Sequence, residues 1–553
     1  MSAAREAGRR LLKKIGPEER LRLSIFCSIL LTFLSRLIIV RRISPSGAAY
    51  LFSSVDILIF FLVLIPVGAS EAVHDLIHKR KKIGYMKNAG RIFLSAFLHI
   101  LAYVVFVIIL WIFCARRFSE TFLFGKAGLS TLLAMLPLFA ADAFTLIFRG
   151  HSDGYYGGTH SGYIMLLRQF LAFVLVLIFA GINSASGSSV SALLRNNVVE
   201  YIYDANGVLV LLMIAAFATL ILYTLTVMGG HYERSLKRGR DTNRKHESPT
   251  GMFYSMTFPF SLAFLSFLSF HFASLLVYGK TLKDSISWLK SYVWGMYSGV
   301  LGSLCLLPYV MIFFLIYNSI RKLGYGMKGE DRGEYRIRCM NLSGESMLIC
   351  FFFAVFYAVE APFLTGGLFK LESALAVRLI WFGIIPMILC CIAINTSMQL
   401  ILIKKFGMLG LHCLIALIPA LLIMIFIPGI NVAGMGIYSL LLASGVFYLI
   451  CALLNYIRLS RELHYSFDPM RVIVLPALCA IASGVPVLIL SLLFSLFMPH
   501  ILIVIIGFVL YFFCFFFAIC KAGLISIYSL KRIPLGRYFA KLALKLRFLE
   551  EEE

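Results

Sequence analysis

Six charged side chains stand inside stretches of sequence that are otherwise apolar and long enough to cross a lipid bilayer. A charge at the middle of a bilayer costs about 2.5–3.5 kcal/mol on insertion scales, so it usually faces a partner or a water-filled cavity. Such side chains are the first candidates for chemistry inside a membrane, with His99 and His271 as weaker ones. In chain order the six are Arg36, Asp56, Asp142, Arg168, Glu360 and Arg378.

Arg36 is the strongest of these candidates because it lies deep within the apolar run Leu30–Val40. Arg42 follows six residues later, so the two side chains are offset by more than one helical turn. A guanidinium group presents a fixed fork of donors that matches a phosphate or pyrophosphate. We therefore expect Arg36 and Arg42 to bind substrate. An ion pair between Arg36 and Asp56 that serves only packing is the alternative.

Two further arginines, Arg168 and Arg378, lie nearer to the ends of their apolar stretches. Either they bind substrate in a cavity, or they extend along the helix until the charged group reaches water. The sequence favours neither reading, and both residues are predicted here as substrate-binding. Arg149, at the end of another stretch, is expected to reach water.

The carboxylates Asp56 and Glu360 are the candidates for coupling transport to an ion. Glu360 lies two residues before Pro362, and a proline removes a helical hydrogen bond and can bend the helix. A carboxylate at such a bend can bind a cation or carry a proton. A structural hydrogen bond to Glu360 is an equally good explanation.

Motifs of enzyme chemistry are missing from the chain. The sequence contains no HExxH, no GxSxG and no complete Walker A motif. The twelve cysteines are scattered and show no zinc-ligand spacing. We therefore expect no catalytic residue, no cofactor and no metal, and a process driven by an ion gradient, the membrane potential or the substrate's own gradient.

The elements that must position these charges are long apolar helices. The chain of 553 residues is 60% apolar, whereas soluble proteins are about 45–50% apolar. Segments of about 20 apolar residues cross a bilayer as helices, since no water there can satisfy backbone groups. The predicted fold class is therefore an all-α polytopic membrane protein with about fourteen spans. The predicted spans lie near 23–40, 47–69, 92–114, 127–148, 163–182, 208–228, 252–277, 293–317, 346–369, 373–396, 409–427, 434–456, 472–497 and 500–520.

A basic, polar stretch between the sixth and seventh spans suggests a division of the chain into two six-helix lobes with two extra C-terminal helices. The predicted units are a basic N-terminus (1–22), an N-lobe (23–228), a basic linker (229–251), a C-lobe (252–456), spans thirteen and fourteen (472–520) and a basic tail (521–553).

The net charge of +24 does not predict a nucleic-acid partner, because most of the 51 Lys and Arg residues crowd into alternate loops. This is the positive-inside pattern of membrane proteins. It places both termini in the cytoplasm and suits contact with anionic lipid headgroups.

Four short motifs, in their order along the chain, resemble motifs of the multidrug/oligosaccharidyl-lipid/polysaccharide (MOP) exporter superfamily. Within it, the stage V sporulation protein B-like and lipid II flippase branches show the resemblance. The similarity extends over nearly the whole chain through the fourteen-span layout. The motifs are Ser35-Arg36-x5-Arg42, the segment Pro66–Ala72, Phe148-Arg149-Gly150 followed by Gly154–Gly157, and the segment Ile427–Gly436.

This resemblance implies two lobes around a central cavity that opens alternately to either side of a bacterial plasma membrane. It also implies a substrate carried on a polyprenyl pyrophosphate, with Arg36 and Arg42 near the pyrophosphate or the adjoining sugar. The chain differs from lipid II flippases at Ile43, where they carry an acidic residue, and at Leu62, where a cavity arginine is expected. A related lipid-linked glycan is therefore the expected substrate, used in peptidoglycan or surface polysaccharide synthesis.

Three other functions remain open at this point. A cation-coupled drug antiporter of the same superfamily would favour a cavity lined by carboxylates. A membrane enzyme of glycan assembly would need a large outer loop, and the longest here, 183–207, is short. A non-transporting scaffold would recruit cell-wall enzymes through the basic loops. The expected partners are the lipid-linked glycan, membrane lipids and glycan-assembly enzymes.

Overall fold

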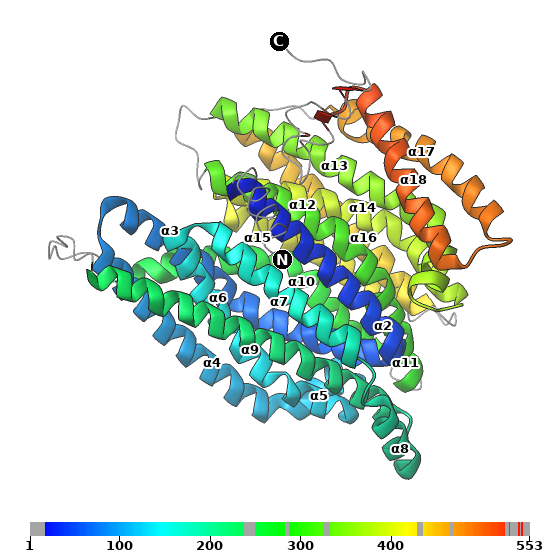
Figure 1. Ribbon diagram of the computed structural model, residues 1–553, viewed down its shortest axis with the longest axis horizontal. Helices are drawn as coiled ribbons and strands as arrows, with labels where there is room; N and C mark the ends of the chain where they lie inside the picture. Colours follow the sequence, from blue (N-terminus) through cyan, green and yellow to red (C-terminus); the bar gives the residue numbers. More distant parts are fainter. Residues whose placement is uncertain are drawn as a thin grey trace, which may run out of the picture.

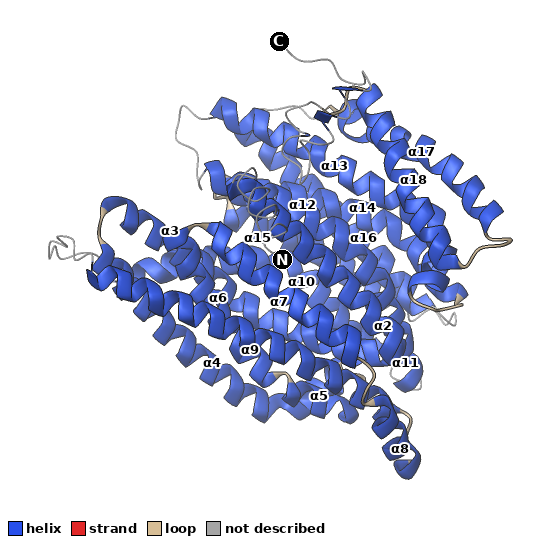
Figure 2. Ribbon diagram, viewed as in Figure 1, coloured by secondary structure: helices blue, strands red, loops and turns tan. Residues whose placement is uncertain are grey.

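The computed structural model describes residues 17–236, 249–281, 287–323, 332–427, 435–464 and 468–525, and residues 530, 540, 541, 544 and 545 of the tail. Within these ranges the chain is almost entirely helical and contains no strand (Figure 2). The predicted all-α class is confirmed. Most of the basic N-terminus, linker and tail, and most of the motif at 427–436, lie outside the described residues.

The first half of the described chain forms eight α-helices and one short 3-10 turn. These are α2 (Pro17–Leu64), α3 (Pro66–Ile83), α4 (Met86–Phe122), η1 (Lys126–Gly128), α5 (Leu129–Ala134), α6 (Leu136–Tyr156), α7 (Gly158–Phe179), α8 (Ser184–Leu194) and α9 (Val198–Leu236).

The second half is interrupted at three places by a π-helical turn, in which the hydrogen bonds run one residue further than in an α-helix. Its elements are α10 (Pro249–Thr281), α11 (Ser287–Gly295), η2 (Met296–Leu301), α12 (Gly302–Leu323), α13 (Arg332–Phe363), η3 (Leu364–Leu368), α14 (Ala374–Leu402), α15 (Phe406–Phe426), α16 (Met435–Leu463), η5 (Met470–Val474), α17 (Leu475–Phe494) and α18 (His500–Lys521).

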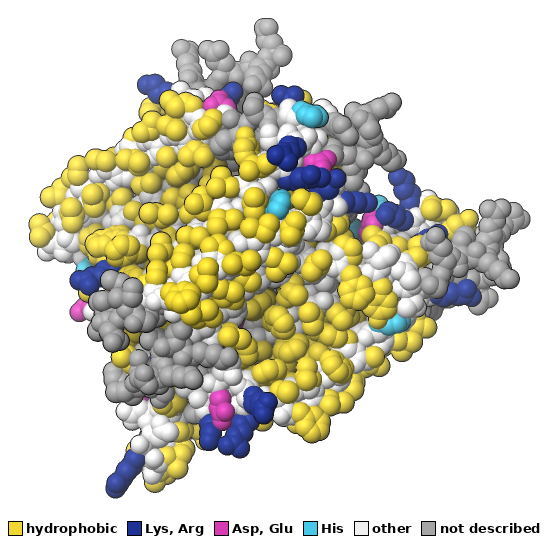
Figure 3. Space-filling view, turned by 180° about the vertical axis from the view of Figure 1, so that it is seen from behind, with side chains coloured by type: hydrophobic (Ala, Val, Ile, Leu, Met, Phe, Trp, Pro, Cys, Tyr) yellow, Lys and Arg dark blue, Asp and Glu magenta, His cyan; other side chains and the backbone are white. Residues whose placement is uncertain are grey.

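Thirteen helical segments of the described chain are long and apolar enough to cross a membrane. Figure 3 shows apolar side chains spread over a broad face, with Lys and Arg gathered at its margins. Large apolar side chains such as Phe113, Ile385 and Phe426 are exposed at the surface of the protein. Because lipid is the solvent that suits such a surface, the protein is a multi-pass membrane protein.

The count of thirteen agrees with the predicted fourteen spans once α2 is recognised as two helices. Ser44 is non-helical (φ 64°, ψ 162°) and precedes Pro45, and a proline cannot continue a regular helix. A straight helix would hold Leu21 and Leu62 about 60 Å apart. Both residues line cavities that meet at Met165, so the chain turns back at Ser44.

The helices pack in two groups that follow the chain. Helices α2, α3, α4, α6, α7 and α9 pack against one another, and α10 and α12–α16 form a second set (Figure 1). Helices α17 and α18 pack on each other and on α13 at one edge. This packing is compatible with two lobes and two added helices, although the predicted lobe boundaries stay a prediction.

Glycines bring the two groups into close contact at α2 and α3. A Cβ at Gly295 of α11, which continues through η2 into α12 of the second group, would overlap the carbonyl oxygen of Pro45. One at Gly68 of α3 would overlap the carbonyl oxygen of Thr257 on α10. Small residues let membrane helices approach until their backbones touch. The contact between the two groups therefore depends on these two positions.

We predict that Gly295→Ala destabilises the protein by about 1–3 kcal/mol or more, because the added methyl group overpacks a contact with backbone. Gly344→Ala on α13 is the matched control, since a Cβ there meets nothing within 4 Å. Thermal unfolding in detergent measures both. Equal melting temperatures for the two variants would show that α11 does not pack as tightly on α2 as described.

Candidate functional site

Arg36 reaches from α2 to the segment that joins α11 and α12. Its Nε donates to the hydroxyl of Ser303 at 3.1 Å, and its Nη2 donates to the carbonyl oxygen of Ser298 at 3.1 Å. The guanidinium carbon lies 3.9 Å from the centre of the Phe52 ring, a cation–π geometry. Arg36 therefore connects the two groups of helices through neutral partners.

The carbonyl of Ser298 belongs to the π-helical turn η2. At the end of η2 the backbone N–H of Gly302 bonds to the carbonyl of Tyr297, five residues earlier. Such turns distort an α-helix locally and occur frequently at functional sites. The distortion presents the Ser298 carbonyl to Arg36, so η2 is part of the candidate site.

Asp56 makes a second connection between the two groups. One of its carboxylate oxygens lies 3.0 Å from Nε2 of His271 on α10. The Asp56 charge also acts on Arg36 through space. The sequence left open a direct Arg36–Asp56 pair, but the structure pairs the Asp56 carboxylate with His271. Arg36, Asp56 and His271, with Ser298 and Ser303, form what we call the central cluster.

The other predicted residues lie elsewhere. Arg42 is exposed, and its backbone lies near Gly181 in the connection between α7 and α8. Arg378 is exposed near the start of α14. Neither side chain contacts the central cluster in the part of the chain that the structure describes.

Glu360 lies on the far side of α13, against the last two helices. It is fully buried and accepts a hydrogen bond of 2.5 Å from the hydroxyl of Ser491 on α17. Its carboxylate also packs against Gly507 of α18. The structural hydrogen bond that the sequence left open is thus present, and Glu360 joins three helices.

Arg168 belongs to a different site, which lies among α2, α6, α7 and α9. It pairs with Asp142 of α6 at 2.7 Å, with both side chains largely buried. The pair borders what we call the large cavity, which has a volume of about 150 Å³. Its lining residues are Leu62, Asp142, Thr145, Leu146, Arg149, Met165, Arg168, Gln169, Thr219 and Tyr223.

A second space, the small cavity of about 20 Å³, shares Arg149 and Met165 with the large one. It extends between α2 and α12, where Leu21, Ile25, Phe314 and Tyr317 line it. The two cavities therefore adjoin at Arg149 and Met165, between the contact of the two groups of helices and the Asp142–Arg168 pair.

Arg149 stands where the two cavities meet. Its Nε lies 3.6 Å from a carboxylate oxygen of Asp153, one turn along α6. A glycine directly follows each of these two residues. Gly150 and Gly154 bring α6 against the backbone of Ser70 and His74 on α3. The glycines fix one face of α6 to α3 and thereby orient Arg149.

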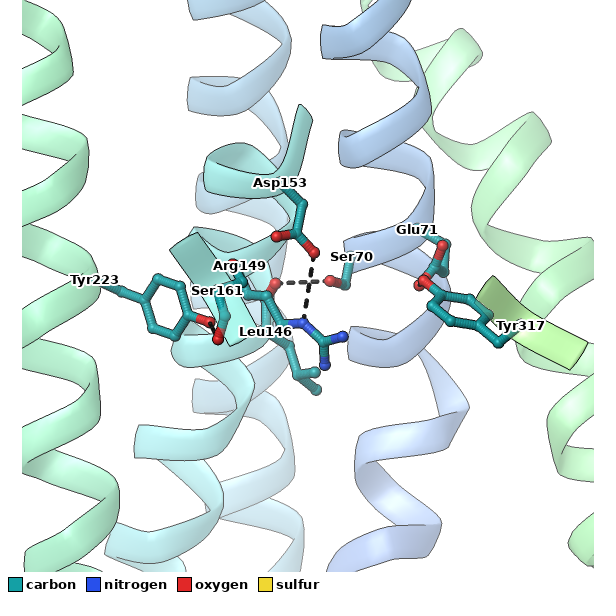
Figure 4. Close-up of polar contacts among 8 residues, drawn as sticks. All are labelled: Ser70, Glu71, Leu146, Arg149, Asp153, Ser161, Tyr223 and Tyr317. Atoms are coloured by element: carbon teal, nitrogen blue, oxygen red, sulfur yellow. Dashed lines mark hydrogen bonds and ion pairs between the residues drawn. The ribbon is translucent and has the colours of Figure 1, made fainter. Parts of the chain in front are cut away.

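Figure 4 shows this arrangement. Asp153 and Arg149 face each other on α6, with Tyr223 on one side and Glu71 and Tyr317 on the other. The Tyr317 hydroxyl donates to Glu71 at 2.6 Å, which links α12 to α3. This is a third polar connection between the two groups of helices.

Sequence reasoning missed the role of Arg149, which it expected to reach water at a span end. The structure instead places its side chain between two cavities, 24% exposed. The signal that was available is the repeat Arg149-Gly150 and Asp153-Gly154. Residues four apart lie on the same face of a helix, so the two charges share one face and the two glycines share the neighbouring face.

Solved structures provide comparisons for this geometry. An inward-facing multidrug resistance MATE family transporter of the MOP superfamily aligns with a TM-score of 0.54 and 15% identity, over 81% of this chain and 98% of that one. The lipid II flippase MurJ, in an inward closed conformation, aligns with a TM-score of 0.59 and 13% identity, over 92% and 99%. An outward-facing MATE transporter gives 0.52 and 14%, over 81% and 95%.

The chain has the fold of the MOP superfamily. The predicted resemblance is confirmed at the level of the fold, which is what a likeness at these identities shows. No protein-family model and no curated protein matches the sequence. Within the MOP fold, the roles of the predicted site residues rest on the contacts of this chain.

The Asp142–Arg168 pair allows a test of how charges are held in this fold. We predict that Asp142→Leu or Arg168→Met alone destabilises the protein more than the double variant, because each single change leaves one charge unpaired. Breaking a buried pair costs about 3–5 kcal/mol, and partial exposure of both side chains should lower that figure.

A double-mutant cycle by thermal unfolding measures this coupling. The exposed pair of Arg116 and Glu120 on α4 serves as the control, with an expected coupling of about 0–1 kcal/mol. Strictly additive losses for Asp142 and Arg168 would contradict the ion pair.

Proposed function

We propose that this MOP-fold protein moves a lipid-linked saccharide, carried on a polyprenyl pyrophosphate, across the bacterial plasma membrane by alternating access. The observation that carries the proposal is the setting of Arg36. Among the described residues, its guanidinium is held by a hydroxyl, a carbonyl and an aromatic ring, with no carboxylate within 4 Å. A membrane-embedded cation with neutral partners retains its attraction for a phosphate.

In this proposal the polar head enters the space between the two groups of helices while the polyprenyl tail stays in lipid. A ligand shifts a conformational equilibrium only by its differential affinity for the two states. The pyrophosphate would replace Ser298 and Ser303 as the partner of Arg36. Because those two contacts connect the groups of helices, their loss would favour the opposite opening.

The remaining predicted residues have places in the same proposal. Arg168 lines the large cavity and would contact the head group. The exposed Arg42 and Arg378 would meet it on the outer side, at the turn of α2 and the start of α14, if both termini are cytoplasmic as the charge pattern predicts. Asp56, or Glu360 as the second candidate, would couple the cycle to a cation or proton.

The second candidate is a cation-coupled drug antiporter. It is favoured by the MATE transporters among the similar structures and by the carboxylates of Asp142 and Asp153 beside the two cavities. An organic cation would seek a carboxylate. Because both carboxylates already face arginines, this function has less support than the first.

We predict that Arg36→Ala abolishes flipping of fluorescent polyprenyl-pyrophosphate glycans in liposomes, and that Arg36→Lys retains a small fraction. A lysine keeps the charge but lacks the fork that binds two oxygens at once. Arg116→Ala, which removes an exposed arginine of α4, should leave flipping unchanged.

Two outcomes of the same assay would contradict the proposal. Normal flipping by folded Arg36→Ala would remove Arg36 from the substrate path. A wild-type protein that flips no glycan but exports an organic dye would support the antiporter, and one that does neither would support a scaffold.

For ion coupling, we predict that Asp56→Asn removes the acceleration of flipping by an imposed proton or sodium gradient. The amide can keep a hydrogen bond with His271 but cannot carry the charge. Glu360→Gln, which can still accept a hydrogen bond from Ser491, should retain that acceleration. The reverse result would assign coupling to Glu360, and loss in neither variant would exclude both residues.

A further inference from the structure

The large cavity, which borders no residue of the central cluster, has a chemistry of its own. We propose that it is the saccharide subsite of the transporter, holding one sugar ring while the pyrophosphate lies at the central cluster. This inference rests on the proposed function and adds to it a second site and the class of group that occupies it.

The balance of charge favours an uncharged ligand in the large cavity. Arg168 pairs with Asp142 at 2.7 Å, and Arg149 faces Asp153 at 3.6 Å, so each cation already has an anion. A phosphate would have to displace a carboxylate. A sugar hydroxyl can donate to a carboxylate and accept from a guanidinium at the same time, so a polyol can bind both Asp142 and Arg168, which line the cavity together.

The remaining polar groups of the cavity suit hydroxyls as well. The hydroxyls of Thr145 and Thr219 donate to backbone carbonyls within their helices, which leaves their oxygens as acceptors. Gln169 offers both a donor and an acceptor. Among the described residues, the hydrogen bond of the Tyr223 hydroxyl is a long contact of 3.5 Å with the Ser161 carbonyl, so a ligand hydroxyl can compete for this donor.

The apolar part of the lining and the size of the cavity also fit sugar rings. Leu62, Leu146 and Met165 present apolar surface, which suits the C–H faces of a sugar ring. The cavity volume of about 150 Å³ matches that of an engineered cavity that accepts one six-membered ring. A single ion would leave most of this space unfilled.

The position of the cavity fits a ligand that is joined to a pyrophosphate. Asp56 of the central cluster and Leu62 of the cavity lie six residues apart on the second helix of α2, about 9 Å along its axis. The small cavity continues past Arg149 and Met165 to Tyr317 of α12. A sugar joined to a pyrophosphate at the central cluster would therefore lie within reach of the cavity.

The test compares two carriers, polyprenyl pyrophosphate alone and the same lipid bearing a disaccharide of N-acetylglucosamine. Met165→Trp fills the junction of the two cavities. We expect it to slow flipping of the disaccharide carrier at least tenfold and to leave the sugar-free carrier unchanged. Leu167→Trp, on the exposed side of the same helix, is the matched control and should behave as wild type.

Binding of the free disaccharide is measured in parallel as a rise in melting temperature of the detergent-solubilised protein. Wild type and Leu167→Trp should respond, whereas Met165→Trp should not. Gln169→Leu, which removes hydrogen-bonding groups without filling the space, should weaken the response several-fold.

Equal slowing of both carriers by Met165→Trp, or no slowing of either, would overturn the saccharide subsite while leaving the proposed function in place. If wild type flips neither carrier, the proposed function fails, and binding of the free disaccharide becomes the test of the saccharide subsite. In that case, a wild-type melting temperature that the disaccharide does not change would overturn the subsite as well.

Discussion

The constraint on which this structure depends is the cost of a charge in a medium without water. Each charged group in the apolar body must either have a partner or face a cavity. The type of partner differs from site to site. Arg36 uses a hydroxyl, a carbonyl and a ring, whereas Arg168 uses a carboxylate. These contacts join helices that are distant in the sequence, so the positions of a few charges determine which helices pack together.

In lipid, apolar side chains give helices little preference for contact with one another over contact with lipid, because lipid tails are as apolar as leucine. Close backbone contact at glycine favours contact between helices instead. Gly150 and Gly154 fix α6 on α3, and Gly295 fixes α11 on the turn of α2. Each of these contacts lies beside a polar group of a candidate site. The glycines therefore define the positions from which Arg149 and Arg36 reach their partners.

The sequence predicted the long apolar elements well, since a run of about 20 apolar residues has few alternatives in a membrane protein. It also identified Arg36, Asp56 and Arg168 as buried charges, because such residues are conspicuous in apolar surroundings. It could not predict their partners. The pairing of Asp56 with His271, and of Arg168 with Asp142, depends on how helices face one another. Glu360 shows the same limit, since only the packing of α17 and α18 reveals its contact with Ser491.

The π-helical turn η2 has a consequence for the rotational phase of the helix that follows it. Successive residues of an α-helix are about 100° apart around the axis, so one residue more or less rotates everything beyond that point. By accommodating an extra residue between α11 and α12, the turn sets the azimuth of α12 independently of α11. Phe314 and Tyr317 face the small cavity because of that rotation. A single-residue deletion within 296–301 would turn these rings about a quarter of a revolution away, which makes the length of this segment as constrained as its composition.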